Sequence, residues 1–311
     1  MTPELRRLAI RVGRLLQRAT NGVLTWIFIG ILRAVRLIDR RKLANFTGGL
    51  LRRIGPWLPE HRIGRANLSA ALPEKSPKEI EKILIGVWDN LGRVAAEFAH
   101  IDRMHVEEPY LPRRPDIIYA PHMLERYHEI RYDNKPALFF AAHVANWELP
   151  ARVAFDYGLK ATVLFRPPNI TAASDAIMRI RAGAMCDLMP TSLDAPVKLA
   201  RILADGGHVG MLVDQHYVKG VEVKFFGRTC KANPLIAQLA RHTNCFVRGI
   251  RVTRLPDGNH FQGELTEPLD LPRDAQGEVD IQGTMQLITS VIEGWVREHP
   301  EQWLWLHRRW R

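Results

Sequence analysis

The sequence predicts an α/β fold in which a mixed, largely parallel sheet is covered by helices. From about residue 137 onward, short apolar runs typical of buried strands alternate with longer segments whose apolar residues recur every three or four positions. Such alternation is the pattern of strands joined by helices within one sheet. A chain of 311 residues is also long enough to bury a substantial core, as one large domain or as a domain with an appended arm.

The individual elements follow from this periodicity and from the breakers between them. A long helix is expected to begin after Ser76-Pro77 and to end near His100, because its apolar residues form one stripe at three- and four-residue spacing. The strands are expected near residues 137–142, 161–165, 208–213, 245–253 and 260–266. The other helices are expected near residues 147–157, 171–184, 195–204, 233–242 and 284–298.

The positive charge of the chain is concentrated in its first 65 residues. They hold 14 Lys and Arg against three Asp and Glu, an excess equal to the net charge of +11 for the whole chain. Residues 1–65 are therefore expected to form a basic helical arm that anchors the protein to an anionic membrane surface, and residues 66–311 the main domain.

Residues 22–32 of this arm form an uncharged stretch, with Arg18 before it and Arg33 and Arg36 after it. Its 11 residues are too few for a comfortable membrane span, which needs about 20. Three interpretations remain open: a tilted span lengthened by snorkelling arginines, a helix lying in the membrane interface, and a core helix with a solvated basic face.

The sequence lacks the patterns of a metal centre, a disulfide framework or a covalent nucleophile. Its three cysteines are odd in number and include no CxxC pair, so the main body is expected to be cytoplasmic and reduced. It also contains no G-x-S-x-G elbow, no P-loop and no GxGxxG motif. We therefore expect chemistry that needs neither a metal nor a nucleophilic side chain.

The leading candidates for catalysis are His143 and Glu148, a base and a carboxylate five residues apart. Residues 137–142 predict a buried strand, and Asn146 and Pro150 predict a helix that begins just before Glu148. His143 then lies in the turn between them, at the carboxyl end of the sheet, where ligands bind in α/β folds.

Spacing alone does not select this pair, because a chain of this composition contains about one such match by chance. A second match, His128 and Asp133, lies in a polar segment with no predicted strand before it, and we discount it. A structural histidine with satisfied hydrogen bonds is the alternative interpretation of His143.

Two basic segments are candidates for binding an anionic substrate. Arg166 follows the strand at residues 161–165 in a stiff turn, where its guanidinium either binds a phosphate or carboxylate or is simply exposed. Arg179 and Arg181 are two residues apart on a predicted helix and thus on different faces, so at most one of them points into the site.

Two further segments are expected near the same crevice. Asp214 and Gln215 follow the strand at residues 208–213, where Asp214 either caps a turn or binds substrate. In Phe225-Phe226-Gly227-Arg228, Gly227 permits close backbone approach and Arg228 adds positive charge, with a plain hairpin edge as the alternative.

A site with one base, several cations and no nucleophile suits attack by an external hydroxyl on an activated acyl group. His143 is expected to remove the hydroxyl proton, and Glu148 to orient the imidazole and stabilise its cation. Backbone N–H groups or an arginine are expected to hold the oxyanion, while the other arginines hold an anionic acceptor.

Several blocks run along the chain in a characteristic order. They are an N-terminal apolar helix, Glu97 in WDNLGRVAAEF, and then HVANWE, FRPPN, MLVDQ, KFFGR and the terminal HPEQWLWLHRRWR. In this order they resemble the late acyltransferases of lipid A biosynthesis, the lauroyl and myristoyl transferases, which are a branch of the glycerolipid and lysophospholipid acyltransferase superfamily.

The resemblance implies a glycerolipid acyltransferase-like mixed sheet, with His143 and Glu148 as the H-x4-D/E catalytic pair and Arg166 and Arg181 lining the site. It implies an acyl–acyl carrier protein donor and a Kdo-bearing lipid A precursor as acceptor. It also implies a location at the cytoplasmic face of the inner membrane of a Gram-negative bacterium, and no metal or organic cofactor. After FFGR the sequence departs from the family, with TCKANPLIAQLA in place of a Thr- and Gly-containing turn, so acyl chain length is left open.

The C-terminal segment combines tryptophans with basic residues. Its tryptophans, Trp303, Trp305 and Trp310, suit a bilayer interface, phosphate groups or the packing of a terminal helix in the core. Its arginines are better explained by an anionic partner.

Two other functions remain open. One is an acyl-CoA-dependent acyltransferase for another glycolipid, such as a mannosylated phosphatidylinositol. The other is a non-enzymatic basic protein that binds nucleic acid or membrane. Within the arm the basic residues alternate with Leu, Ile, Val and Trp instead of forming a polar tail, which favours a membrane over nucleic acid.

Overall fold

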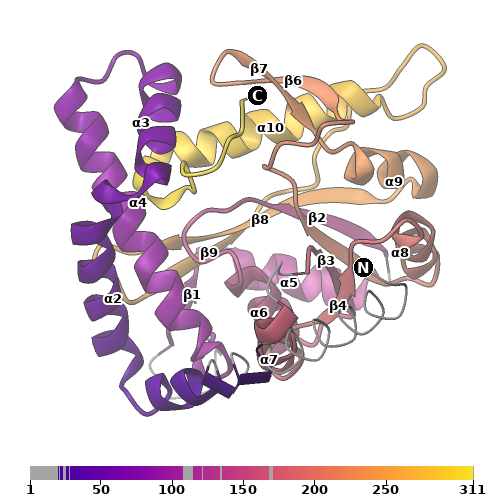
Figure 1. The fold of residues 1–311 in the computed structure, drawn as a ribbon. Helices are drawn as coiled ribbons and strands as arrows, with labels where there is room; N and C mark the ends of the chain where they lie inside the picture. The colour runs from indigo at the N-terminus through magenta and orange to yellow at the C-terminus, as the bar shows by residue number, and fades with distance from the viewer. Residues whose placement is uncertain are drawn as a thin grey trace, which may run out of the picture.

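A seven-stranded sheet forms the centre of the computed structural model (Figure 1), which describes residues 20, 22–23, 26–27, 29–107, 115–120, 122–133, 135–167 and 171–310. The strand order is β1-β9-β8-β2-β5-β3-β4, and neighbouring strands are parallel except for the antiparallel pair β8–β9. The strands are β1 (Ile117–Tyr119), β2 (Ala137–Ala141), β3 (Ala161–Phe165), β4 (Asp187–Pro190), β5 (His208–Leu212), β8 (Phe246–Arg254) and β9 (Phe261–Leu265). The predicted mixed, largely parallel sheet is therefore confirmed.

Helices cover both faces of the sheet (Figure 1). On one face α8, α9 and α10 pack on one another, and on the other face α6 contacts β3 and β8 while α5 contacts β9. Helices α2, α3 and α4 form a layer at one end of the sheet (Figure 1), and α7 contacts β4. The helices are α2 (Arg40–Ile54), α3 (Pro59–Ala71), α4 (Pro77–Phe98), α5 (Met123–Tyr132), α6 (Leu149–Asp156), α7 (Thr171–Ala182), α8 (Ala195–Ala204), α9 (Leu235–Thr243) and α10 (Ile281–Glu298).

Every strand and helix expected between residues 76 and 298 is present, with ends within a few residues of the expected ones. The structure adds α2, α3, α5, β1, β4 and a hairpin of β6 (Val221–Phe225) and β7 (Arg228–Ala232). β1 and β4 have only three and four residues, too few for a periodic pattern to appear in the sequence. The hairpin packs on α10, where the Phe226 N–H donates to the Glu293 carboxylate at 2.6 Å.

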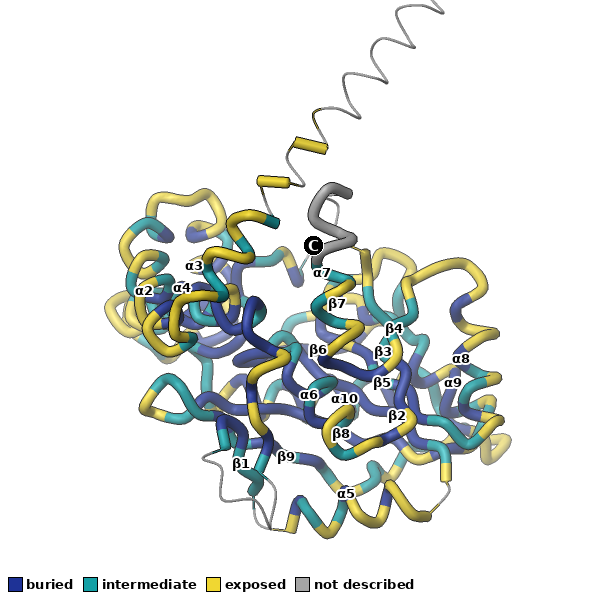
Figure 2. Tube along the Cα trace, turned by 90° about the horizontal axis from the view of Figure 1, so that it is seen from below, coloured by how far each residue is buried: buried dark blue, intermediate teal, exposed yellow. Residues whose placement is uncertain are grey.

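Helix α4 shows how directly the local sequence sets an element. Ser76 caps its first turn in a capping box, in which the Ser76 hydroxyl accepts from the Glu79 N–H and the Glu79 side chain accepts from the Ser76 N–H. Most of the apolar stripe predicted for it is buried, including Leu84 and Trp88, and its other members are partly buried. Figure 2 shows the same division, with buried positions along the strands and the inner faces of the helices, and exposed positions on the outside.

Strands β2 and β5 lie side by side in parallel, and their register brings their last residues to the same level. Ala141 at the end of β2 is paired with Leu212 at the end of β5. All five residues of β2 are buried, as expected for a strand with helices on both faces. The chain segments that leave β2 and β5 therefore start together at the sheet's carboxyl edge.

The first 65 residues contribute to the folded body as well as to the arm. Helices α2 and α3 both pack on α4, and residue 65, where the arm was expected to end, lies within α3. Residues 1–19, 21, 24, 25 and 28 of the arm lie outside the described residues. Within the described part of the chain, no helix combines the length and the apolar character that crossing a bilayer requires.

Helices α2 and α4 approach each other through glycines. A Cβ atom added at Gly92 of α4 would lie 2.4 Å from the Thr47 carbonyl oxygen of α2, and one added at Gly48 would lie 2.8 Å from the Asp89 carboxylate. The two backbones are therefore packed too closely for any side chain at Gly92.

We predict that Gly92→Ala destabilises the protein by about 1–3 kcal/mol, the usual cost of overpacking a close contact. Gly49→Ala is the matched control, because a Cβ atom there meets nothing within 4 Å and alanine favours a helix. Urea unfolding monitored by circular dichroism measures both. Equal stability of the two variants would contradict close α2–α4 packing.

Candidate active site

His143 and Asp214 form the centre of the candidate site. Each lies two residues beyond a strand end, after Ala141 of β2 and Leu212 of β5, and these ends are paired in the sheet. The His143 ring Nδ1 lies 2.8 Å from Asp214 Oδ1, and the His143 backbone N–H donates to Oδ2 at 2.9 Å. Asp214 therefore holds the imidazole at two points.

The two groups shift each other's pKa. Burial by itself lowers the pKa of His143, but the charge and hydrogen bond of Asp214 and the charge of Glu148 outweigh it, so the pKa is raised above 6.5. Burial raises the pKa of Asp214, yet the charge of His143 and the hydrogen bonds from it lower the pKa well below 3.8. Asp214 is thus ionised, accepts the Nδ1 proton, and leaves Nε2 as the basic atom of the ring.

The expected partner of His143, Glu148, is engaged elsewhere. Arg181 donates to the Glu148 carboxylate from Nε at 3.1 Å and from Nη2 at 2.5 Å. This corrects the expectation that Glu148 orients the imidazole, since Asp214 does so, although the charge of Glu148 still favours the imidazolium. Glu148 is the N-cap residue of α6, and Arg181 comes from α7.

The C-terminal segment closes one side of the site. The Trp303 indole N–H donates to Asp214 Oδ2 at 2.8 Å, and the Leu304 N–H donates to the His143 carbonyl at 3.1 Å. Trp303 and Trp305 are 1% and 0% exposed, so core packing is the correct interpretation of these tryptophans. The segment is a short 3-10 turn followed by irregular chain, and not a terminal helix.

The expectation that the C-terminal arginines bind an anionic partner is wrong for Arg309. This side chain is 1% exposed, and its Nη1 donates to the carbonyls of Gln215 at 3.0 Å and Lys231 at 2.7 Å. Arg309 thereby ties the Gln215 segment to β7. Arg308 is exposed, and Arg311 lies outside the described residues.

The loop between β2 and α6, residues 142–148, is held by a buried polar network. Ala145 adopts a φ of 47°, which is unfavourable for alanine. Its N–H donates to the Gln302 carbonyl at 2.8 Å, and its carbonyl accepts from Asn90 at 3.0 Å. The next residue, Asn146, donates to the Glu97 carboxylate at 3.0 Å.

Glu97 and Arg254 form the ion pair at the centre of this network. Glu97 is fully buried, and its two carboxylate oxygens accept from both terminal nitrogens of Arg254. Arg254 is the last residue of β8, and its Nε donates to the Asn90 side chain at 3.0 Å. Helix α4, strand β8 and the C-terminal segment thus converge on the β2–α6 loop.

The other predicted site residues divide into two groups. Gln215 joins the centre, because its Nε2 lies 3.2 Å from His143 Nε2, and Arg166 is exposed just beyond the carboxyl end of β3. Arg228 does not join it: it begins β7, with its guanidinium 4.6 Å from the Trp310 ring centroid. Phe226 and Gly227 have φ values of 52° and 69°, typical of a two-residue turn, so the hairpin alternative is confirmed.

The structure also settles which helix arginine faces the site. Arg181 reaches Glu148 at its edge, whereas Arg179 lines a separate groove with the N-terminal helix. The discounted His128 is exposed on α5. Asn90, Arg254 and Trp303 were not predicted as site residues, because each is far from His143 in sequence and none belongs to a local catalytic pattern.

No three His, Cys, Asp or Glu side chains gather as a metal site anywhere in the described ranges. The three cysteines are free and buried. What the described residues offer is an anchored imidazole whose Nε2 faces the Gln215 amide. This arrangement suits removal of a proton from a bound hydroxyl.

The sequence matches the family described as bacterial lipid A biosynthesis acyltransferase over residues 14–311, nearly the whole chain. The chain belongs to this family. It is also 24% identical to "Lipid A biosynthesis acyltransferase 2" of Shigella flexneri over 294 residues, which cover 91% of this chain and 88% of that protein.

As a member of the lipid A acyltransferase family, the protein is an acyltransferase of lipid A biosynthesis, and this sets aside a non-enzymatic basic protein. The blocks that carried the resemblance meet in space around His143. HVANWE, MLVDQ and the C-terminal block supply the dyad and its Trp303 contact, and Glu97 supports the loop between them.

We predict that Asp214→Asn lowers acyl transfer by at least about 100-fold and moves the acid limb of the pH profile to lower pH. A base acts only when neutral, so kcat/KM of the parent falls as pH drops through a pKa above 6.5. Removing the Asp214 charge lowers that pKa. Asp205→Asn, at an exposed carboxylate after α8, is the control. An acid limb that stays in place in Asp214→Asn would rule out this coupling.

We predict that Glu97→Gln lowers the free energy of unfolding by about 3–5 kcal/mol, because it leaves Arg254 buried without its counter-charge. The double variant Glu97→Leu, Arg254→Met should recover much of that stability, yet stay poorly active because Asn146 has lost its acceptor. Urea unfolding and acyl transfer are measured on each. Asp194→Asn, in an exposed pair with Lys198, should leave the free energy of unfolding nearly unchanged. Full activity of the double variant would contradict the positioning role of Glu97.

Proposed function

We propose that this protein transfers a fatty acyl chain from acyl–acyl carrier protein to a hydroxyl of a Kdo-bearing lipid A precursor. The anchored His143 carries the proposal, because its Nδ1 is fixed by Asp214 while Nε2 meets only a side-chain amide at 3.2 Å among the described residues. Family membership supports the acceptor class. The location we propose is the cytoplasmic face of the inner membrane.

The reaction we propose proceeds by direct transfer without an acyl-enzyme. The acceptor hydroxyl takes the place of the Gln215 amide at His143 Nε2 and gives its proton to that atom as its oxygen attacks the thioester carbonyl. The tetrahedral intermediate then expels the carrier thiolate, which takes the proton from the imidazolium. Asp214 and Glu148 both stabilise the imidazolium formed between these steps.

The Glu148–Arg181 pair is proposed to support the base and not to bind the acceptor. Arg181 is held between the Phe98 and Phe165 rings, with its guanidinium carbon 5.5 and 5.7 Å from their centroids. A guanidinium fixed in this way keeps the Glu148 carboxylate in place. Arg166, exposed at the edge of the sheet, remains the proposed acceptor contact from this part of the sequence.

Membrane binding through the arm is part of the proposal. Helical positions of the arm expose large apolar side chains, with Trp26 70%, Ile27 53% and Ile31 58% exposed. Arginines come directly after this apolar surface in the sequence. Apolar side chains with adjacent arginines are the composition that binds an anionic membrane surface.

The test is transfer by the purified protein in mixed micelles, with the product identified by mass spectrometry. We expect the mass of the lipid A precursor to rise by one acyl chain with acyl–acyl carrier protein as donor, and His143→Ala to lose at least roughly 100-fold in rate. His128→Ala, on the exposed face of α5, should keep the parental rate. Equal rates with acyl-CoA, or transfer only to a phosphatidylinositol mannoside, would favour the other glycolipid acyltransferase instead.

A further inference from the structure

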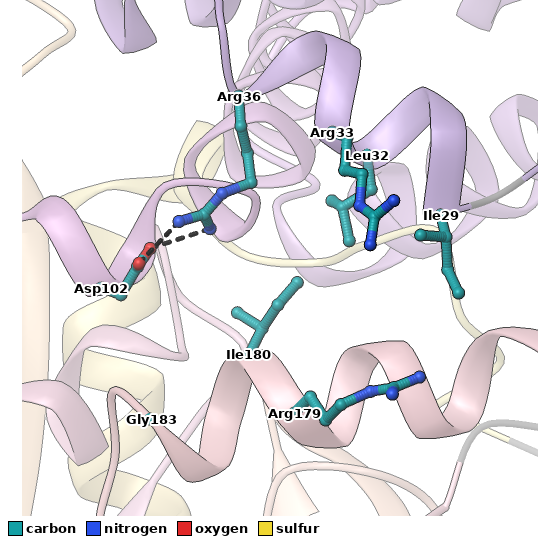
Figure 3. Close-up of a pocket in the computed structure, with 8 residues that line it drawn as sticks. All are labelled: Ile29, Leu32, Arg33, Arg36, Asp102, Arg179, Ile180 and Gly183. Carbon is teal, nitrogen blue, oxygen red and sulfur yellow. Dashed lines mark hydrogen bonds and ion pairs between the residues drawn. The ribbon is translucent and has the colours of Figure 1, made fainter.

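A concave site lies beside α7, the helix that also carries Arg181, the partner of Glu148. It is a groove of about 380 Å³ between the N-terminal helix (residues 29–35) and α7. Figure 3 shows Ile180 pointing from α7 toward the N-terminal helix, and Arg33 pointing from that helix toward α7. The lining residues are Ile29, Leu32, Arg33, Arg36, Asp102, Arg179, Ile180 and Gly183.

The lining of this groove carries a net positive charge, with three arginines against one carboxylate. That carboxylate, Asp102, is paired with Arg36 through two hydrogen bonds of 3.0 and 2.6 Å. Arg33 has no hydrogen-bond or ion-pair partner within the described part of the chain. Arg179 has a contact of its own, and its side chain is exposed to solvent. Two guanidinium groups at the rim of a small groove with an apolar floor favour an anionic group attached to a lipid.

Helix α7 contributes side chains both to the groove and to the catalytic centre. Arg181, which holds Glu148, lies two residues from Arg179 on α7. Phe98, whose ring packs against Arg181, lies at the end of α4 shortly before Asp102. The groove is therefore separated from Glu148 by the width of one helix, about 10 Å. A large glycolipid that presents one hydroxyl to His143 reaches that far with its other groups.

We propose that this groove binds a phosphate group of the lipid acceptor, with Arg33 and Arg179 as its donors. The inference rests on the proposed function, since it requires a phosphorylated lipid A precursor as acceptor. In this proposal the phosphate is bound by Arg33 and Arg179, which belong neither to the His143–Asp214 dyad nor to the contacts of Glu148. The N-terminal helix then serves the active site directly, by supplying Arg33.

The test compares a phosphorylated lipid A precursor with the same lipid after enzymatic removal of its phosphates, in neutral detergent micelles. Arg33→Gln and Arg179→Gln should each lower kcat/KM for the phosphorylated acceptor roughly tenfold, as expected for losing one charge-assisted contact. Neither should change kcat/KM for the dephosphorylated acceptor or the rate of donor thioester hydrolysis. Arg201→Gln, which removes an equal charge from the exposed face of α8, is the control.

The outcomes separate this inference from the proposed function. Failure of the parent to acylate either form of the precursor would overturn the proposed function, and the inference with it. Parental transfer with no loss in Arg33→Gln and Arg179→Gln would overturn the inference alone. An equal loss with both acceptors would also overturn the inference, because the arginines would then act without recognising the phosphate group.

Discussion

The loop that carries His143 depends on the buried ion pair of Glu97 and Arg254. Ala145 in this loop has a left-handed backbone conformation, and its neighbour Asn146 donates to the Glu97 carboxylate. Burying two charges costs free energy that their attraction recovers only when the remaining donors and acceptors are also satisfied. Here Asn146 donates to the same carboxylate, and Arg254 also donates to Asn90. Each partner comes from a different part of the chain, so the loop conformation depends on the assembled fold and not on local propensity.

The register of β2 and β5 then places the two residues of the dyad next to each other. Ala141 at the end of β2 is paired with Leu212 at the end of β5. The residues two positions after each strand end, His143 and Asp214, therefore lie opposite one another. Asp214 receives two hydrogen bonds from His143 and a third from the Trp303 indole, all between 2.8 and 2.9 Å. A carboxylate with three donors has little freedom to rotate, which fixes the tautomer of the ring as well as its direction.

The sequence was sufficient for five of the seven strands of the sheet, for the helices with clear apolar stripes, and for the place of His143 at a strand end, because these depend on local periodicity and breakers. It identified Asp214 as a strand-end carboxylate but not as the partner of His143, since strand order decides which ends are neighbours. Five-residue spacing suggested Glu148 instead, and only tertiary structure brings Arg181 to that carboxylate. Arg309 was expected to bind an anionic partner, and nothing in the sequence indicated its burial. The backbone carbonyls that accept from it belong to Gln215 and Lys231, which are far away in the sequence.

The pairing of Arg181 with Glu148 also bears on how the site handles charge. Two carboxylates flank the imidazole, and both favour its protonated form. A free acidic group beside the dyad would repel an anionic lipid, but a guanidinium in two-point contact with Glu148 cancels most of that repulsion at short range. Arg181 can do this only while it is not itself bound to the lipid. In the proposed reaction the acceptor's charge is therefore met by other cations, further from the base, where a positive group lowers the imidazole pKa less.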